Sequence, residues 1–280
     1  MAPLRALLID LDGVIYQDER PIAGAADALS WVRDHSIPHA FLTNTTSCPR
    51  QDLVAKLARL GVPVRQEHIV TPAVAAAAWL QLHAPGAAAL FVPRATRTDF
   101  EGVSALDDDA DSGASSVVLG DLGLSWDFRT LNRAFRLLMD NPAAPLVALG
   151  MTRYWRAEDG LRMDVGPFVA ALELATSRRA VVLGKPAPEF FQAALRALDC
   201  SPQEAVMIGD DVIADVGGAR QAGMRTILVR TGKFREADLN TGAPADAVLE
   251  SIADLPDWWD GRGAASGASN ESAKRGRPVR

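Results

Sequence analysis

The chain has 280 residues, of which 48% are hydrophobic and 23% are charged. These proportions are ordinary for folded globular proteins and exclude a chain that is disordered throughout. Its 29 basic and 35 acidic residues give a formal net charge of −6, so the sequence lacks the basic excess that nucleic-acid and membrane-surface binders carry. Two cysteines, Cys48 and Cys200, cannot form a disulfide framework, and they favour a reducing compartment.

The beginning of the chain does not have the pattern of a secretory signal, because Asp10 and Asp12 interrupt its apolar residues. The apolar run 73–80 is much shorter than the roughly 20 residues that a bilayer-spanning helix needs. We therefore expect a cytoplasmic protein with no membrane partner and no nucleic-acid partner.

Short apolar runs alternate with helical patterns toward both ends of the chain. Continuous apolar runs of this kind are typical of parallel strands that are covered on both faces. They predict strands at 6–9, 40–42, 180–183, 205–208 and 226–229. Apolar residues at helical spacing predict helices at 52–60 and 188–198. The alternation predicts an α/β fold with a doubly wound, Rossmann-like parallel sheet.

A second set of elements occupies the middle of the chain. The patterns there predict strands at 87–92, 116–119 and 145–149 and helices at 128–139 and 167–174. This segment is long enough for a smaller α/β domain with its own core. We therefore predict a core made of residues 1–78 and 181–260, with a cap domain of residues 79–180 inserted between them. The tail, 261–280, is rich in Gly, Ala, Ser and Arg and is predicted to be disordered.

Polar side chains follow the predicted core strands. In chain order they are Asp10 and Asp12, Thr43 and Asn44, Lys185, and Asp210 and Asp211. Because the carboxyl ends of the strands line the ligand crevice of an open α/β sheet, we expect these groups to meet at one edge. Carboxylates about 4 Å apart repel by roughly 4 kcal/mol at an effective dielectric constant of about 20. Such a cluster needs a cation, and its oxygen ligands favour Mg²⁺.

Four segments in this order resemble the four motifs of the haloacid dehalogenase (HAD) superfamily. They are DLDGVIY at 10–16, LTNTT at 42–46, GKPAPE at 184–189 and IGDDVIAD at 208–215. The long insert between the second and third motifs resembles the C2A cap of subfamily IIA. The stretches 161–167 and 207–235 are similar to the branch that contains phospholysine phosphohistidine inorganic pyrophosphate phosphatase. The resemblance implies a phosphoric monoester hydrolase that uses Mg²⁺ and acts on a small phosphorylated substrate.

The resemblance also implies catalytic roles. Asp10 would attack phosphorus and become an aspartyl phosphate. Asp12 would protonate the leaving oxygen and then activate the water that hydrolyses the intermediate. Thr43, the amide of Asn44 and the ammonium of Lys185 would bind the phosphoryl oxygens, and Lys185 would also neutralise Asp10.

A metal site and an assembly follow from the same resemblance. Mg²⁺ would be held by Asp10, the backbone carbonyl of Asp12, and Asp210. Asp211 and Asp215 would bind the cation through water or orient its inner ligands. Since relatives often dimerise through the cap, a homodimer is expected as well.

Asp12 bears on which reaction is expected. Some members of the phosphohistidine phosphatase branch have serine at this position, and haloacid dehalogenases proper have no acid there. The pair Asp10 and Asp12 therefore favours phosphoester hydrolysis over dehalogenation. Two alternatives remain open. One is a phosphoacceptor signalling module, which also gathers acids, a hydroxyl and a lysine at a sheet edge; the other is a catalytically idle relative whose cap binds another protein.

Overall fold

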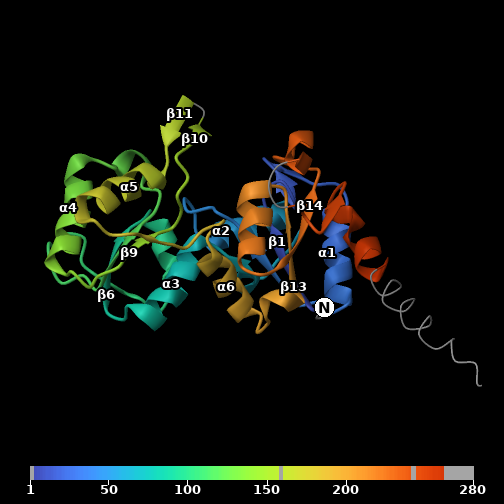
Figure 1. Ribbon diagram of the computed structural model, residues 1–280, viewed down its shortest axis with the longest axis horizontal. Helices are drawn as coiled ribbons and strands as arrows, with labels where there is room; N and C mark the ends of the chain where they lie inside the picture. The colour runs from blue at the N-terminus through green and yellow to red at the C-terminus, as the bar shows by residue number, and fades with distance from the viewer. Residues whose placement is uncertain (1–2, 158–159, 241–243, 262–280) are drawn as a thin grey trace, which may run out of the picture.

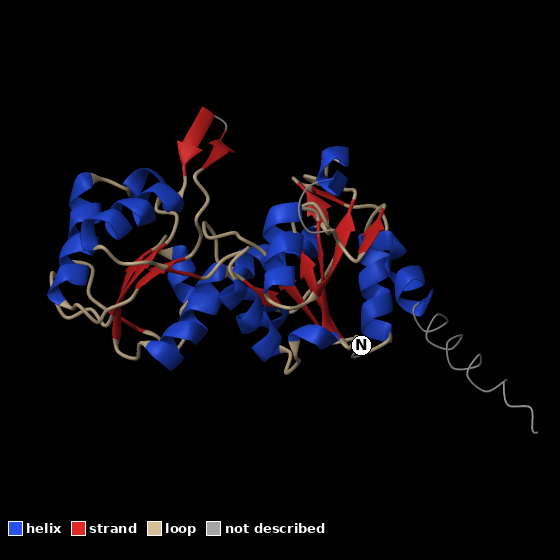
Figure 2. Ribbon diagram, viewed as in Figure 1, coloured by secondary structure: helices blue, strands red, loops and turns tan. Residues whose placement is uncertain are grey.

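The computed structural model describes residues 3–157, 160–240 and 244–261. It contains two parallel sheets, each covered by helices, so the predicted α/β fold with a doubly wound core and a second, smaller sheet is confirmed (Figures 1 and 2). The predicted disordered tail lies, apart from Gly261, outside the described residues. Within the described ranges, none of the helices combines the length and the apolar character that crossing a membrane requires.

The core sheet has six parallel strands with β1 near its centre. Their order across the sheet is β15 (Ala247–Leu249), β14 (Arg225–Val229), β13 (Ala205–Gly209), β1 (Ala6–Asp10), β4 (His39–Leu42) and β5 (Ile69–Val70). Helices α1 (Ala25–Asp34) and α2 (Arg50–Arg59) cover one face, and α6 (Pro188–Ala197) and α7 (Gly218–Gln221) cover the other. All five residues of β1 are buried as a result.

The second sheet has five parallel strands. Their order is β12 (Val181–Val182), β9 (Leu146–Ala148), β8 (Ser116–Leu119), β6 (Ala87–Phe91) and β7 (Ser104–Ala105). Helices α4 (Phe128–Asp140) and α5 (Val165–Thr176) cover its outer face. Helix α3 (Pro72–His83) lies with α6 between the two sheets, where one continuous apolar cluster joins residues of both (Figure 1).

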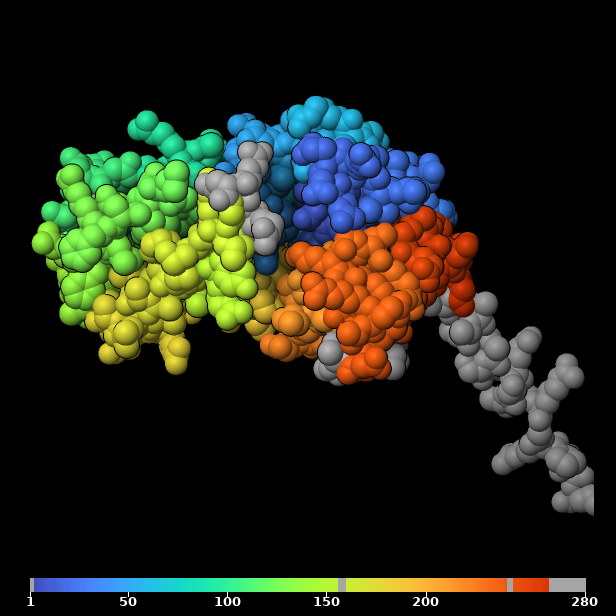
Figure 3. Space-filling model, turned by 90° about the horizontal axis from the view of Figure 1, so that it is seen from above, coloured from blue at the N-terminus to red at the C-terminus, as the bar shows by residue number. Residues whose placement is uncertain are grey.

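Two short hairpins complete the fold. Strands β2 (Tyr16–Gln17) and β3 (Arg20–Pro21) form the first, shortly after β1. Strands β10 (Tyr154–Ala157) and β11 (Gly160–Met163) form the second. Seen from above, this second hairpin, in yellow-green, lies at the junction between the green and yellow lobe of the second sheet and the blue and orange lobe of the core (Figure 3).

One predicted core strand lies in the other sheet, so that prediction is wrong. The run 180–183 is predicted to belong to the core, but Val181 and Val182 pair with Val147 and Ala148 of β9 in the second sheet. A short apolar run looks the same whichever sheet buries it, and periodicity cannot distinguish the two cases. The other four predicted core strands are confirmed as β1, β4, β13 and β14. The boundaries of the cap domain remain a prediction.

Candidate active site

The site lies at the carboxyl end of β1, where Asp10 is the last residue of the strand. Asp10 is only 5% exposed, and its Oδ1 accepts a hydrogen bond from Lys185 Nζ at 2.6 Å. The same ammonium lies 2.7 Å from Asp215 Oδ1. The structure thus brings together the candidate nucleophile, the candidate lysine and one of the acids expected near the metal.

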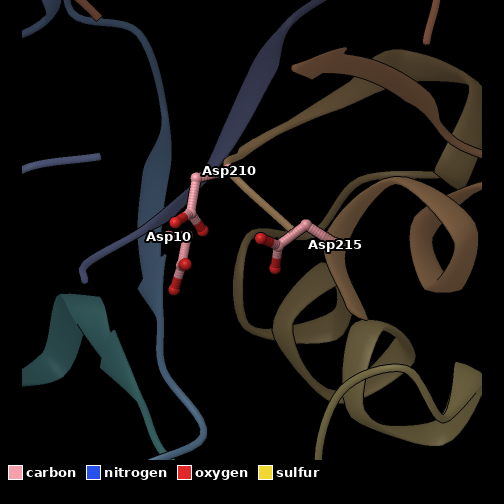
Figure 4. Close-up of side chains that lie close together, drawn as sticks. All are labelled: Asp10, Asp210 and Asp215. Atoms are coloured by element: carbon pink, nitrogen blue, oxygen red, sulfur yellow. The ribbon is translucent and has the colours of Figure 1, made fainter. Parts of the chain in front are cut away.

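Three carboxylates form a cluster around this point. One oxygen each from Asp10, Asp210 and Asp215 lies within 4.8 Å of the other two, and all three residues are buried. Figure 4 shows these side chains close together, with Asp215 pointing toward the other two. Asp210 Oδ1 is buried and accepts no hydrogen bond from any residue that the structure describes. Because hard divalent cations prefer oxygen ligands, this donor set fits such a cation.

The cluster carries more negative charge than Lys185 alone can neutralise. Burial raises the pKa of Asp10 above its ordinary value, although the Lys185 ammonium opposes that effect. Burial, followed by the charge of Asp10, raises the pKa of Asp215 to about 6. Burial alone would lower the pKa of Lys185, but the carboxylates of Asp10 and Asp215 outweigh it and the pKa rises. A bound cation would favour the charged carboxylates and relieve their repulsion.

Two glycines make room for the carboxylate of Asp210. Gly13 and Gly232 have positive φ angles of 83° and 66°, a region that residues with side chains rarely adopt. A Cβ atom on Gly13 would lie 2.1 Å from Asp210 Oδ2, and a Cβ atom on Gly232 would lie 2.0 Å from the same oxygen. The amide of Lys233 donates a hydrogen bond to this oxygen at 2.7 Å. The backbone on both sides therefore holds Asp210 in one position.

Asp211 and Asp215 have different surroundings, although the sequence motif predicts the same role for both. Asp211 precedes the π-helix η5 (Val212–Gly217), and its Oδ1 accepts hydrogen bonds from the amides of Ile213 and Ala214 at 3.0 and 2.9 Å. Asp211 therefore caps this helix. Asp215 instead lies in the carboxylate cluster, where it is available as a direct metal ligand.

Asp12 lies apart from the buried carboxylates. Its residue is exposed, and its backbone pairs with Tyr16 in an isolated bridge at the start of the β2–β3 hairpin. Burial raises the pKa of Tyr16, and the nearby charge of Asp12 raises it further. Water can reach the exposed side chain of Asp12, so its setting suits an acid or base more than a buried ligand.

Thr43 and Asn44 follow β4 and connect to the lysine. Thr43 is buried, and its Oγ1 accepts a hydrogen bond from the amide of Thr45 at 3.2 Å. Asn44 Oδ1 accepts from the amide of Lys185 at 2.8 Å, and Asn44 Nδ2 donates to the Lys185 carbonyl at 3.0 Å. The sequence predicts a role only for the backbone amide of Asn44. The side chain of Asn44 has a second role, because its two hydrogen bonds fix the backbone of Lys185.

Two family models match this chain, one in each half of its sequence. Family models described as haloacid dehalogenase-like hydrolase and HAD-hydrolase-like match residues 7–102 and 182–255. Haloacid dehalogenase-like hydrolase domain-containing protein 2 from Bos taurus is 42% identical over 242 residues, which cover 86% of this chain and 90% of that protein. This chain belongs to the haloacid dehalogenase-like hydrolase family.

Other known proteins are similar to this chain over nearly its whole length. Human phospholysine phosphohistidine inorganic pyrophosphate phosphatase is 36% identical over 262 residues, covering 92% of this chain and 94% of that protein. NagD from E. coli K-12 superposes with a TM-score of 0.79 at 26% identity, covering 90% of this chain and 98% of that chain. A 4-nitrophenylphosphatase from Thermotoga maritima gives a TM-score of 0.78 at 26% identity, with 90% and 96% covered. Membership of HAD subfamily IIA is confirmed, and these names support the predicted enzyme class.

The structure places one further segment at the site, for which the sequence predicts no role. This is the loop 231–233 after β14. Thr231 Oγ1 donates a hydrogen bond to the carbonyl of Gly13, and Lys233 Nζ lies 3.4 Å from Asp211 Oδ2. The sequence signal that could have pointed to this loop is its position, because it follows the carboxyl end of a core strand.

Proposed function

We propose that this protein is a Mg²⁺-dependent phosphatase that hydrolyses a small phosphorylated substrate through an aspartyl phosphate on Asp10. The observation that carries the proposal is the buried contact between Asp10 and Lys185 inside a cluster of three carboxylates. A carboxylate that an ammonium and a cation keep ionised can act as a nucleophile toward phosphorus. The phosphatase names of relatives in the same family support the same reaction.

The residues that would hold Mg²⁺ are Asp10, Asp210 and Asp215, together with the backbone carbonyl of Asp12. When bound, the cation supplies neutralisation and orientation of the phosphoryl oxygens. Asp211 would contribute by fixing the helix that carries Asp215, since its carboxylate caps that helix. In this assignment Asp215 is a direct ligand, whereas the sequence motif predicts an indirect role for it.

The first half-reaction forms the aspartyl phosphate. An oxygen of Asp10 bonds to phosphorus while the bond from phosphorus to the leaving oxygen breaks. Asp12, in its protonated form, gives its proton to the leaving oxygen. Lys185, the Thr43 hydroxyl and the Asn44 amide hold the phosphoryl oxygens as negative charge redistributes.

The second half-reaction restores the enzyme. Asp12, now a carboxylate, takes a proton from a water molecule whose oxygen attacks phosphorus. The bond between phosphorus and Asp10 breaks, and inorganic phosphate leaves. The exposure of Asp12 suits this double role, because its carboxyl group can reach water in either step.

The cap, proposed as residues 79–180, would cover the site and select the leaving group. Its hairpin exposes four large side chains, which are Tyr154, Trp155, Leu161 and Met163, at 54%, 42%, 64% and 63%. Because large exposed apolar side chains favour protein contacts, the proposal includes a homodimer formed through the cap. The proposal also includes a cytoplasmic location and no nucleic-acid or membrane partner. This part rests on the composition of the chain and on its two cysteines.

Hydrolysis of p-nitrophenyl phosphate tests the proposal. The wild-type protein should release phosphate with Mg²⁺ and lose that activity in excess chelator. Asp10→Asn should lower the rate by at least about 10³-fold, since the nucleophile is gone. A stable phosphorylated protein without turnover would favour the phosphoacceptor signalling module. No reaction with any phosphate compound would favour the idle interaction protein.

A further inference from the structure

The segment after β6 in the second sheet makes polar contacts with the loop that follows β4 in the core. This segment is the short helix η2 (Ala95–Asp99). Asp99 Oδ2 accepts a hydrogen bond from the amide of Arg50 at 3.0 Å, and Asp99 Oδ1 accepts one from Arg50 Nε at 3.1 Å. Thr96 Oγ1 donates to the carbonyl of Thr46 at 3.2 Å. Three hydrogen bonds thus join η2 to this loop and to Arg50, the first residue of α2.

These contacts are buried. The side chain of Asp99 is 2% exposed and that of Arg50 is 13% exposed, while Thr96 is 1% exposed overall. Removing one partner of a buried ion pair leaves the other charge without compensation, which is far more disruptive than losing a pair in solvent. The pair therefore constrains the geometry of the loop to a degree that a surface pair would not.

Asp99 also supplies the missing cap of α2. The residue at the N-cap position of α2 is Pro49, which provides no side-chain hydrogen bond. The carboxylate of Asp99 accepts from the first amide of the helix instead. A negative charge at a helix N-terminus is also favourable toward the helix dipole. A residue of η2 thereby fixes where α2 begins and where the loop ends.

The other end of the loop is tied to the catalytic lysine. The side chain of Asn44 makes two hydrogen bonds to the backbone of Lys185, and Thr43 Oγ1 accepts from the amide of Thr45. The phosphate-binding groups of the proposed function, Thr43 and the Asn44 amide, lie at this end. The segment 43–50 is therefore held at its start by the site itself and at its end by η2.

We propose that Asp99 is a positioning residue for phosphate binding, and this role rests on the proposed phosphatase function. By fixing Arg50 and the start of α2, Asp99 sets the path of the loop and so the direction of the Thr43 hydroxyl and the Asn44 amide. These groups contact phosphoryl oxygens in the bound substrate and in the transition state alike. Loss of Asp99 should therefore weaken ground-state binding of phosphate more than it slows the chemical step.

Asp99→Asn tests this, because it removes the charge with little change in shape. With p-nitrophenyl phosphate and Mg²⁺, KM and the inhibition constant of inorganic phosphate should rise together, on the order of tenfold, while kcat stays within about threefold. Hydrogen exchange should become faster in segment 43–50 and remain unchanged in β8 and β9. Thr96→Val, which removes only the Thr46 contact, should give a smaller change in the same direction.

Asp108→Asn is the matched control. It breaks the ion pair between Asp108 and Arg97, a residue of η2 itself, whose closest atoms are 2.6 Å apart. Among the described residues, these two side chains hydrogen-bond to each other and to the carbonyl of Leu90, and not to segment 43–50. The control should keep the wild-type KM. If Asp99→Asn lowers thermal stability but leaves KM, phosphate inhibition and loop exchange at wild-type values, Asp99 is merely structural and the proposal is wrong. If the wild-type protein itself shows no turnover, the proposed function fails, and the exchange data alone then decide whether Asp99 orders the loop.

Discussion

Lys185 Nζ lies 2.6 Å from Asp10 Oδ1, although the two residues are 175 positions apart in the sequence and the strands before them belong to different sheets. Asp10 ends a core strand, whereas Lys185 follows β12 of the second sheet. The active-site ion pair is therefore also a link between the two sheets. A displacement of one sheet relative to the other would change the charge balance of the site.

Replacing Lys185 should affect metal binding and catalysis in opposite directions. Lys185→Gln removes the only ammonium that pairs with Asp10 and Asp215 among the described residues. The affinity for Mg²⁺ should rise, on the order of tenfold, since a competing cation has gone. The turnover number should fall by at least about 100-fold, because the phosphoryl oxygens lose a donor. Calorimetric titration with Mg²⁺ and steady-state kinetics measure the two effects.

Lys233→Gln provides the comparison for this experiment. The side chain of Lys233 is 66% exposed and contacts Asp211 at 3.4 Å, so solvent screens its charge. Both Mg²⁺ affinity and turnover should change by less than about threefold. A loss of Mg²⁺ affinity in Lys185→Gln would instead show that the lysine supports the metal site, and the expected competition between the two cations would be wrong.

The part of the site that follows adjacent core strands is predictable from the sequence. Asp10 ends β1 and Asp210 directly follows β13. These two strands pair with each other, so their carboxyl ends bring the two acids together. Lys185 lies beside Asp10, but the premise that led to this expectation is wrong, because the strand before Lys185 lies outside the core sheet. What holds the lysine is the Asn44 side chain, a tertiary contact that no periodicity reports.

Other contacts have a weak sequence signal or none. Gly232 and Lys233 lie in an irregular loop, and Asp99 lies in a short helix far from the motifs in the chain. Gly232 and Lys233 reach Asp210 because β14 pairs with β13 in the core sheet, whereas Asp99 reaches Arg50 only through the packing of the two sheets. The different roles of Asp211 and Asp215 have the same origin, since both acids satisfy the motif and only the path of η5 separates them.

Gly232→Ala should weaken metal binding through a steric effect. The added Cβ would lie 2.0 Å from Asp210 Oδ2, so the carboxylate must move. We expect Mg²⁺ affinity to fall by at least about tenfold, together with a loss of stability of about 1 kcal/mol or more from the positive φ angle. Calorimetric titration and urea denaturation measure these two quantities.

Gly61→Ala separates the steric effect from the backbone effect. Gly61 has a φ angle of 77°, and a Cβ there would meet nothing within 4 Å. This variant should lose a similar amount of stability from backbone strain and keep the wild-type affinity for Mg²⁺. Equal Mg²⁺ affinities in the two variants would mean that the position of Asp210 does not depend on Gly232.

The metal-free protein should lose stability as pH rises from about 4 to about 6. The pKa of Asp215 is about 6 in the folded protein, against an ordinary value of 3.8. Between these two values the folded state retains a proton that the unfolded state has lost, so deprotonation favours unfolding. At about 1.4 kcal/mol per pH unit, the loss is on the order of 3 kcal/mol.

Asp215→Asn should remove the part of this dependence that comes from Asp215, because the asparagine does not titrate, while the raised pKa of Asp10 leaves a remainder. Urea denaturation in chelator at several pH values would give the free energy of unfolding of both proteins. Between pH 4 and 6 the free energy of unfolding of the variant should increasingly exceed that of the wild type, and above pH 6 the difference should stay constant. Saturating Mg²⁺ should restore the stability of the wild type at pH 7. Parallel curves for the two proteins across this range would rule out Asp215 as the titrating group.

Identifying the phosphorylated residue is the most direct test of the proposed mechanism. Asp12→Asn, which lacks the base for the second step, would be mixed with p-nitrophenyl phosphate and Mg²⁺, quenched in acid, digested and examined by mass spectrometry. We expect one phosphoryl group on the peptide that contains Asp10, and none in Asp10→Asn treated in the same way. Turnover by the wild type with no phosphorylated peptide, and with activity retained in Asp10→Asn, would contradict the mechanism.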